Sequence, residues 1–522
     1  MKKRWISALI SCAMAGVLLV GAPVCVMAEG EEEKTDIASA VPETLEEIPE
    51  AAAADVEAFM SDTDEKTVLV DARPQECYAG WALEGAKNGG HLKNAALFSA
   101  RWLDCEIKDA RTVYLTKALK DQKIDAADKV IVYDYTGEQA NIVANYFKGQ
   151  GVKDVAIFKA NEMIDAGKDL VSYENYDRFL PTEIVKSVSD VKSGKAAELS
   201  EEAKAIFPDG LDKVVLVDVS WGNARTSAYF TEGHVPGAVH INTDCYERPR
   251  VYVPEKRSEY AKEWRLIPLE EFRDSICTQY GITKDSTVIV TGPGTAPLGR
   301  LSFMLRSVGV KVYVMTGTLK AWKYNGYELD TDPSTLVIPE SVDDFGSDEI
   351  ANPDEIIWND TIEKILSGEV DGTVADNRGD DEWGGKYSGY SYHDLAGHVD
   401  GAVKCTQDTD GSQNFSNADD TARTQEEIVG YMASCGVDAN KLTAFYCGDS
   451  WGAAYIAYWC QSVDLNNIKE WGTGWIPWSN EGHPFIDSQG RLVHYDKYLD
   501  TVLDENGNDV RDGLNILDDA EN

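Results

Sequence analysis

The chain has 522 residues, a length that suits about three domains. Its hydrophobic content of 43% and aromatic content of 10% are ordinary for a globular protein and too high for a disordered one. The net charge of −41 would repel nucleic acid and anionic membranes, so the composition excludes a nucleic-acid-binding protein.

Residues 1–28 have the features of a cleaved signal peptide. Positive residues 2–4 precede an apolar stretch over residues 6–26, and Val26-Met27-Ala28 forms a small-x-small cleavage pattern. The alternative is a retained membrane anchor, since the stretch is just long enough to span a bilayer. The acidic run at residues 31–33 favours cleavage. We therefore expect a secreted, periplasmic or cell-envelope protein with no membrane attachment, whose charge becomes −44 when the three positive side chains of the leader are lost.

Cysteines are few for a disulfide scaffold. Ten become eight when the leader is removed, and they fall into three groups along the chain: Cys77 and Cys105; Cys245 and Cys277; Cys405, Cys435, Cys447 and Cys460. One disulfide per domain and buried free thiols are both compatible with this spacing.

A repeat is written three times in the chain. An apolar, β-branched run ending in aspartate occurs at residues 68–71, 215–218 and 373–376, and 16 to 22 residues later each is followed by the histidine of a Gly-His pair (His91, His234 and His398). Runs that are continuously apolar are typical of buried parallel strands. The aspartate recurs at intervals of 147 and 158 residues, which is a domain length rather than a solenoid period.

Each repeat continues with further strand and helix signals. Second strands are predicted at residues 129–133, 286–290 and 441–446, helices at 139–147, 298–308 and 453–460, and last strands at 152–158 and 310–315. Strand–helix alternation predicts βαβ crossovers and an α/β fold, in which a parallel sheet is flanked by helices on both faces.

The predicted organisation follows from the repeats and the acidic, Pro-containing stretches between them. It comprises a signal peptide (1–28), an acidic linker (29–54), three domains (55–172, 182–332 and 352–484) and an acidic tail (485–522) to which no domain is assigned.

These motifs resemble the rhodanese (sulfurtransferase) family, in three tandem copies. The family pattern is a strand ending Asp-x-Arg, then Gly-His-x-x-Gly-Ala, then a strand that delivers a cysteine into a tight loop before a helix. Asp71-Ala72-Arg73 and Asp376-Asn377-Arg378 match the first element, and residues 232–238 are close to the family signature. Residues 317–322 and 474–478 resemble the family's glycine–tryptophan segment.

The Gly-His histidines could suggest a metal site, but they lie about 150 residues apart without partners at ligand spacing. A structural role at a turn is the favoured interpretation, and we expect neither a metal nor a cofactor. The tail residues 504–509 lack the pattern of a calcium loop.

The resemblance places the nucleophile first in the loop after the second strand, and this position is occupied by Asp134, Thr291 and Cys447. Neither aspartate nor threonine can carry sulfur, so the first two domains are expected to be inactive and the third catalytic. Structural burial is the alternative for Cys447. Cys460, in the following helix, is expected to be a core residue.

The candidate catalytic residue is Cys447, and the resemblance implies substrate binding by the loop after it and by one arginine: Gly448, Asp449, Ser450, Trp451, Gly452, Ala453 and Arg378. Backbone N–H groups and a helix dipole at such a junction stabilise a sulfur anion, so we expect the pKa of the thiol to fall. Asp449 would oppose this unless it points to solvent. Arg378, Lys404 or Arg423 could offset it, although Arg378 could equally hold the Asp376 turn.

The leading hypothesis is an exported sulfurtransferase that moves sulfane sulfur from a donor of the thiosulfate or 3-mercaptopyruvate type to a thiol or cyanide, through a Cys447 persulfide. Whether Asp449 excludes anionic donors, and the oligomeric state, stay open. A non-catalytic scaffold of rhodanese-like modules is the alternative. A phosphatase or arsenate reductase is disfavoured, because Ala453 stands where the Cys-x5-Arg motif needs arginine.

Overall fold

The computed structural model describes residues 40–61, 66–104, 111–248, 264–390, 393–409 and 412–511. The predicted signal peptide and Cys105 lie outside the described residues. Among the helices that are described, none is both long enough and apolar enough to cross a membrane.

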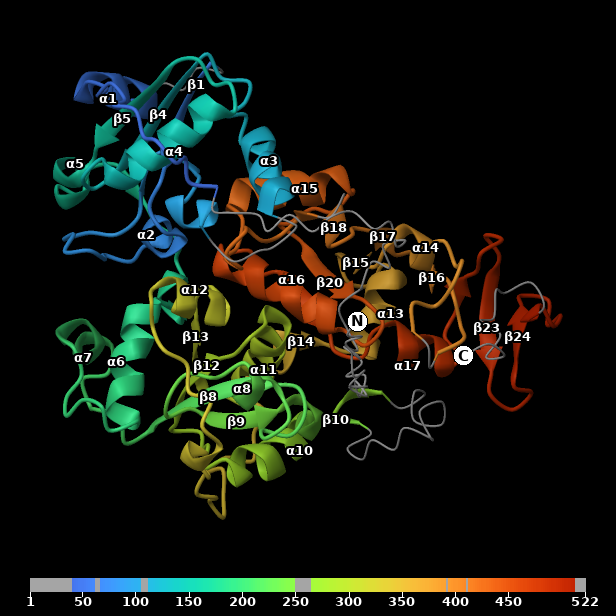
Figure 1. Ribbon diagram of the computed structural model, residues 1–522. Helices are drawn as coiled ribbons and strands as arrows, with labels where there is room; N and C mark the ends of the chain where they lie inside the picture. Colours follow the sequence, from blue (N-terminus) through green and yellow to red (C-terminus); the bar gives the residue numbers. More distant parts are fainter. Residues whose placement is uncertain are drawn as a thin grey trace, which may run out of the picture.

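The three repeats each form a parallel sheet, and these sheets define what we call the first, second and third unit (Figure 1). The first sheet has the order β3 (Ala96–Leu97), β1 (Thr67–Asp71), β4 (Lys129–Asp134), β5 (Val155–Lys159). The second has the order β7 (Phe179–Leu180), β13 (Lys311–Met315), β12 (Thr287–Thr291), β8 (Val214–Ser220), β9 (Val239–Asn242). The third has the order β14 (Ile356–Ile357), β21 (Ile468–Trp471), β20 (Leu442–Tyr446), β15 (Gly372–Asp376), β17 (Val403–Lys404). The predicted α/β fold is confirmed.

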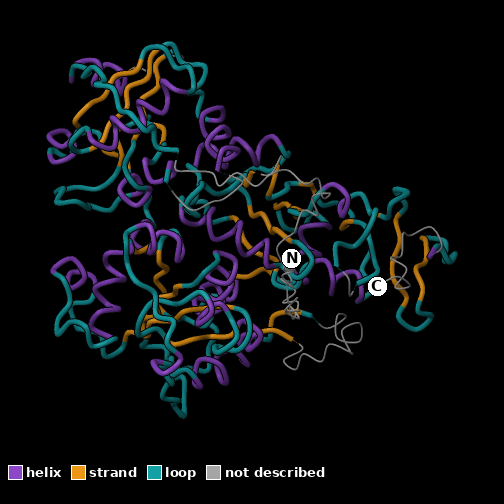
Figure 2. The backbone as a smooth tube through the Cα atoms, in the orientation of Figure 1, coloured by secondary structure: helices purple, strands orange, loops and turns teal. Residues whose placement is uncertain are grey.

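Helices lie between successive strands and flank the sheets (Figure 2). Those of the first unit are α1 (Ala53–Ser61), α2 (Gln75–Ala79), α3 (Arg111–Asp121), α4 (Glu138–Gly149) and α5 (Asn161–Asp165). Those of the second are α6 (Thr182–Lys192), α7 (Glu201–Ile206), α8 (Ala228–Thr231), α10 (Leu269–Glu271), α11 (Thr295–Ser307) and α12 (Thr318–Tyr324). Those of the third are α13 (Asn359–Leu366), α14 (Asp380–Trp383), α15 (Gln425–Ser434), α16 (Trp451–Ser462) and α17 (Trp475–Asn480).

The Gly-His histidines have the structural role that was expected. In each unit the histidine ring stacks on an aromatic ring at 3.6 to 3.7 Å between centroids and its Nδ1 lies 2.8 to 2.9 Å from the main-chain oxygen of that same aromatic residue. The pairs are Tyr78–His91, Tyr229–His234 and Trp383–His398. Burial lowers the pKa of all three histidines, so they are neutral components of the fold.

The segment expected to be an acidic tail without a domain is partly a sheet. Strands β22 (Phe485–Ile486), β23 (Leu492–Asp496) and β24 (Thr501–Asp504) form an antiparallel sheet with β16 (His398–Val399). The apolar side chains that drive this are Phe485, Val493 and Val502, which are buried in the core of the third unit. The nearby acidic residues Asp487, Asp496 and Asp504 made the segment polar in overall composition.

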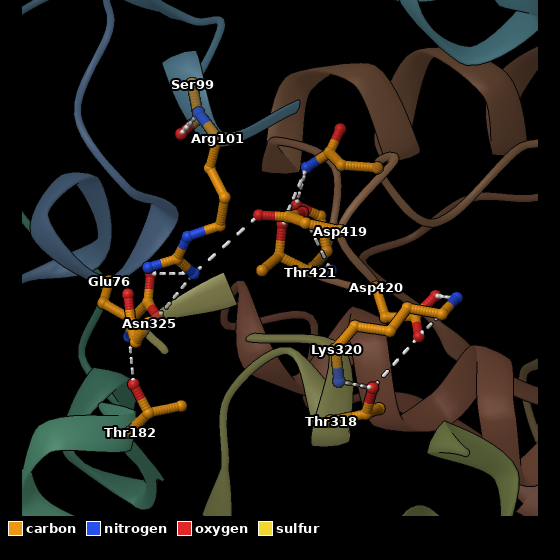
Figure 3. Close-up of polar contacts among 12 residues, drawn as sticks. Glu76, Ser99, Arg101, Thr182, Thr318, Lys320, Asn325, Asp419, Asp420 and Thr421 are labelled. Atoms are coloured by element: carbon orange, nitrogen blue, oxygen red, sulfur yellow. Dashed lines mark hydrogen bonds and ion pairs between the residues drawn. The ribbon is translucent and has the colours of Figure 1, made fainter. Parts of the chain in front are cut away.

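The three units share packing and polar contacts. One cluster of buried apolar residues runs continuously through all three, and α11 of the second unit packs along α16 of the third. Figure 3 shows a polar junction between the units. Arg101 of the first unit lies 3.0 Å from Glu76 of the same unit and 3.9 Å from Asp419 of the third unit. Lys320 of the second unit pairs with Asp420 at 2.9 Å. These contacts hold the third unit against both others.

Candidate active site

Cys447 lies at the junction between the end of β20 and the start of α16. Its Sγ accepts a hydrogen bond from the N–H of Gly452 at 3.3 Å, and the N–H groups of Asp449 and Ala453 also stabilise the thiolate. We call these three N–H groups the amide cradle. The convergence of main-chain donors that the loop sequence predicted is therefore present. Cys447 is only 8% exposed.

The expectation that the thiol pKa falls was wrong. Burial raises the pKa of the Cys447 thiol to about 11, the charge of Asp449 adds to the increase, and the amide cradle only partly opposes it. Desolvation of an anion in the protein interior outweighs a few N–H dipoles here. The sequence indicates a helix N-terminus but not how deeply the sulfur beneath it is buried.

Asp449 points inward rather than to solvent. It is fully buried, and the Cys447 thiol donates to its Oδ1 across 4.0 Å. Burial raises the pKa of Asp449, while Arg300 and the N–H groups of its own residue and of Trp451 act in the opposite direction. The carboxylate is therefore a direct neighbour of the Cys447 sulfur.

The other loop residues shape the site by close packing. The N–H of Gly448 donates to the hydroxyl of Tyr390 at 2.8 Å, and a Cβ on Gly448 would overlap that tyrosine ring. Ser450 has φ of +71° and donates its hydroxyl to the oxygen of Trp471. A Cβ on Gly452 would lie 2.5 Å from the side-chain amide of Asn377. Any side chain at these two glycine positions would require its neighbours to move.

Trp451 and Ala453 are fully buried. Trp451 packs on Trp221 of the second unit, with 4.4 Å between ring centroids. These two loop residues, expected to bind substrate, are therefore parts of the core and of the contact between units.

The glycine–tryptophan segment holds the loop from the other side. Trp475 and Ile476 donate their N–H groups to the oxygens of Cys447 and Gly448, at 2.9 and 2.8 Å. Gly474 allows this approach, since it has φ of +73° and a Cβ there would lie 2.8 Å from the Gly448 oxygen. The loop is thus fixed by main-chain hydrogen bonds at the start of α17.

Arg378 is placed in a structural ion pair. Its Nε and Nη2 donate to the carboxylate of Asp376 at 3.0 and 2.6 Å, and Nη2 also donates to the oxygen of Gly397 at 2.7 Å. Arg73 of the first unit makes the same contacts with Asp71 and Gly90. The same arrangement occurs in the first unit, where Asp134 rather than a cysteine stands at the end of β4. The ion pair of Arg378 therefore stabilises the turn after Asp376.

Lys404 and Arg423, the other cations considered from the sequence, are also engaged in ion pairs. Lys404 pairs with Asp380, and Arg423 pairs with Asp121 and Glu427.

Arg300 is a cation beside the loop that begins at Cys447, and it was not expected from the sequence. It comes from α11 of the second unit, is fully buried, and donates to the main-chain oxygen of Asp449 at 2.7 Å. Its guanidinium lies 2.7 Å from the carboxylate of Glu247 and 4.7 Å from the ring centre of Trp451. A charged residue within the apolar run 298–308 was the available signal.

The equivalent positions in the first two units differ from cysteine. In the first unit, the carboxylate of Asp134 accepts hydrogen bonds from the N–H groups of Gly137 and Gln139, the latter at 2.8 Å, so a carboxylate occupies the main-chain donors of that loop. Burial nevertheless raises the pKa of Asp134.

In the second unit, Gly292 rather than Thr291 is the counterpart of Cys447. Thr291 pairs in register with Asp218, just as Tyr446 pairs with Asp376. The assignment of Thr291 was therefore wrong by one residue, because the strand extends one residue further than its apolar run. A Cβ on Gly292 would lie 2.5 Å from a main-chain oxygen, and glycine has no side chain that could carry sulfur.

No two cysteines of the described residues are joined in a disulfide; these cysteines are Cys77, Cys245, Cys277, Cys405, Cys435, Cys447 and Cys460. Cys460 is fully buried in α16, and burial raises its pKa. Within the same residues, His, Cys, Asp and Glu side chains form no group of three or more that could hold a metal ion.

Comparison with known proteins finds a family match in two segments of the chain. The rhodanese-like domain family matches residues 52–160 and 199–325, which carry the first sheet and all strands of the second sheet except β7. The thiosulfate sulfurtransferase YnjE of Escherichia coli (strain K12) is 24% identical over 417 residues, covering 79% of this chain and 87% of the relative. A mitochondrial thiosulfate/3-mercaptopyruvate sulfurtransferase of Arabidopsis thaliana is 21% identical over 295 residues, covering 52% of this chain and 73% of the relative.

Solved structures share the fold over most of the chain. The anaerobic ergothioneine biosynthesis enzyme from Chlorobium limicola, in complex with its natural substrate trimethyl histidine, superposes with a TM-score of 0.69 at 25% identity, covering 84% of this chain and 99% of that one. A structure of an EanB variant with a cysteine persulfide and ergothioneine has a TM-score of 0.68 at 24% identity, covering 83% and 97%.

Proposed function

We propose that this chain, two segments of which match the rhodanese-like domain family, is a sulfurtransferase in which Cys447 accepts sulfane sulfur from a donor as a persulfide and passes it to a thiophilic acceptor such as a thiol or cyanide. The observation that carries the proposal is the amide cradle around Sγ at the strand-to-helix junction. The relatives named as thiosulfate sulfurtransferases support the reaction class.

The test is the mass of the protein after incubation with thiosulfate, 3-mercaptopyruvate or glutathione persulfide. We expect an added mass of one sulfur atom on the peptide that contains Cys447, and release of thiocyanate when cyanide follows. Cys447→Ser should lose both signals. Cys435→Ser is the matched control and should keep both signals. Cys435 is partly exposed and its hydrogen bond with Cys405 lowers its pKa, so sulfur on this thiol in the wild type would reveal indiscriminate sulfuration.

Burial of Cys447 also favours the alternative, a scaffold that uses rhodanese-like units as rigid surfaces. A protein that takes no sulfur on Cys447 from any of the three donors would support the scaffold and overturn the enzyme.

We also propose that the protein is exported. The basic start, apolar stretch and cleavage pattern of residues 1–28 support this. N-terminal sequencing of protein from its native host should find the mature chain starting at Glu29. An N-terminus at Met1 or Lys2 would contradict export by cleavage.

A further inference from the structure

The carboxylate of Asp449 is positioned to exchange a proton with the reactive sulfur. Its Oδ1 is the atom toward which the Cys447 thiol donates, across 4.0 Å. Both residues belong to one loop of four residues between β20 and α16. In the described residues, Asp449 Oδ2 has no hydrogen-bond partner although it is fully buried.

Arg300 holds this part of the loop in place. Its Nη1 donates to the main-chain oxygen of Asp449 at 2.7 Å, and its charge favours the ionised carboxylate. Arg300 itself faces two further buried carboxylates, Glu247 and Glu470. Burial raises the pKa of Glu247 to about 8 and that of Glu470 to about 7.

The guanidinium of Arg300 is thus a positive charge close to three buried carboxylates, those of Asp449, Glu247 and Glu470. The charges of Asp449 and Glu470 add to the rise in the pKa of Glu247, since like charges in a desolvated cluster repel. A carboxyl group whose pKa is raised toward the working pH is also a better general base than an exposed one.

We propose that Asp449 is the catalytic proton acceptor for the Cys447 thiol, and that Arg300 is the positioning residue that aims it. This inference rests on the proposed sulfur-transfer function and names the group that activates its nucleophile.

With thiosulfate as the donor, sulfur transfer takes two steps. The Cys447 proton moves to Asp449 Oδ1 while Sγ attacks the outer sulfur of the donor. A new S–S bond forms, the donor S–S bond breaks, and sulfite leaves with the bonding electron pair. Attack of cyanide on the outer sulfur of the persulfide then gives thiocyanate and the Cys447 thiolate, which recovers its proton from Asp449.

A proton-accepting role and a purely electrostatic role for Asp449 predict opposite effects of Asp449→Asn on the rate of persulfide formation. Removing the negative charge lowers the thiol pKa, because Asp449 is the second contributor to its increase. If Asp449 only opposes the thiolate, Asp449→Asn should form the persulfide faster. If it accepts the proton, the same variant should be slower at neutral pH in spite of a more acidic thiol.

The experiment measures the rate of Cys447 persulfide formation from thiosulfate between pH 6 and 10, with iodoacetamide alkylation reporting the thiol pKa. For Asp449→Asn we expect a rate lower by about 10²-fold at pH 7, a lower thiol pKa, and recovery of the rate at high pH. Asp371→Asn is the matched control, since that carboxylate is exposed at the far end of the same sheet. A rate at pH 7 equal to or above that of the wild type would overturn the inference.

Arg300→Lys provides an independent test, because it keeps the charge but loses the planar fork. We expect folded protein whose pH–rate profile is displaced and whose rate at pH 7 lies between those of the wild type and Asp449→Asn. An unchanged profile would contradict the positioning role. The proposed function and this inference fail in different ways. A wild-type protein that takes up no sulfur refutes the proposed function. Normal sulfur transfer by the wild type, together with unaffected Asp449 and Arg300 variants, refutes this inference alone.

Discussion

Gly299 of α11 faces the main-chain oxygen of Ala454 on α16 so closely that a Cβ atom on residue 299 would lie 2.8 Å from that oxygen. Helix α11, which follows β12 in the second unit, and helix α16, which follows β20 in the third, therefore meet at a glycine. Arg300 is the next residue, and it reaches the loop of Cys447 from there. The contact between these helices thus determines where the arginine stands.

Gly299→Ala should destabilise the protein and slow sulfur transfer. The overlapping atom is main-chain, so α11 must move away from α16, at a cost of about 1–3 kcal/mol, and Arg300 moves with it. Chemical unfolding and thiocyanate release measure the two effects. Gly430→Ala on α15 is the control, because a Cβ there meets open space; it should gain about 0.5–1 kcal/mol. Equal stability changes for the two variants would contradict the close contact.

Asp218 is a buried carboxylate without the arginine that its counterparts have. Burial raises its pKa to about 7, against a hydrogen bond from Thr291. The folded state favours the protonated form of Asp218. The contribution of this group to the stability of the folded protein is therefore complete below about pH 4, falls as the pH rises, and is lost once the pH passes about 7. Asp218→Asn should therefore raise the urea midpoint at pH 8 and change it little at pH 4.

Asp71→Asn is the matched variant of opposite sign. Asp71 pairs with buried Arg73 at 2.7 Å, so its removal leaves an uncompensated buried charge at a cost of about 3–5 kcal/mol. A loss of stability at pH 8 for Asp218→Asn as well would show that the uncompensated carboxylate is not the cause of the pH dependence.

Arg378→Lys and Arg73→Lys should lose similar amounts of stability and leave the KM for thiosulfate unchanged. Lysine cannot reproduce the paired hydrogen bonds that each arginine makes to its aspartate. Unfolding midpoints and steady-state kinetics test this. A KM that rises several-fold for Arg378→Lys alone would restore the donor-binding role suggested by the family pattern.

Arg101→Met should separate the first unit from the third. It removes the partner of two buried carboxylates, Glu76 and Asp419 (Figure 3), and the expected loss is about 3–5 kcal/mol. Limited proteolysis and thermal unfolding would detect it. Lys320→Met breaks the more exposed pair with Asp420, where less than about 1 kcal/mol is expected. Equal losses would mean that the junction does not depend on the buried pair.

Much of the fold follows from local pattern in the sequence. Continuous apolar runs ending in aspartate predicted strands β1, β8 and β15, and their spacing predicted repeated α/β units. The loop that begins at Cys447 was likewise visible, because a strand signal, glycines and a helix signal stand in order. Where the pattern was ambiguous by one residue, as at Thr291 and Gly292, only strand register resolved it.

Tertiary structure alone decided the chemistry of that loop. Arg300 lies 149 residues from Asp449 in the chain, and no local pattern relates them. Burial of Cys447 raises its pKa against the amide cradle, and Trp451 of the same loop packs on Trp221 of the second unit. A sequence records which groups can ionise, but the desolvation and neighbours that set their protonation exist only once distant segments have packed together.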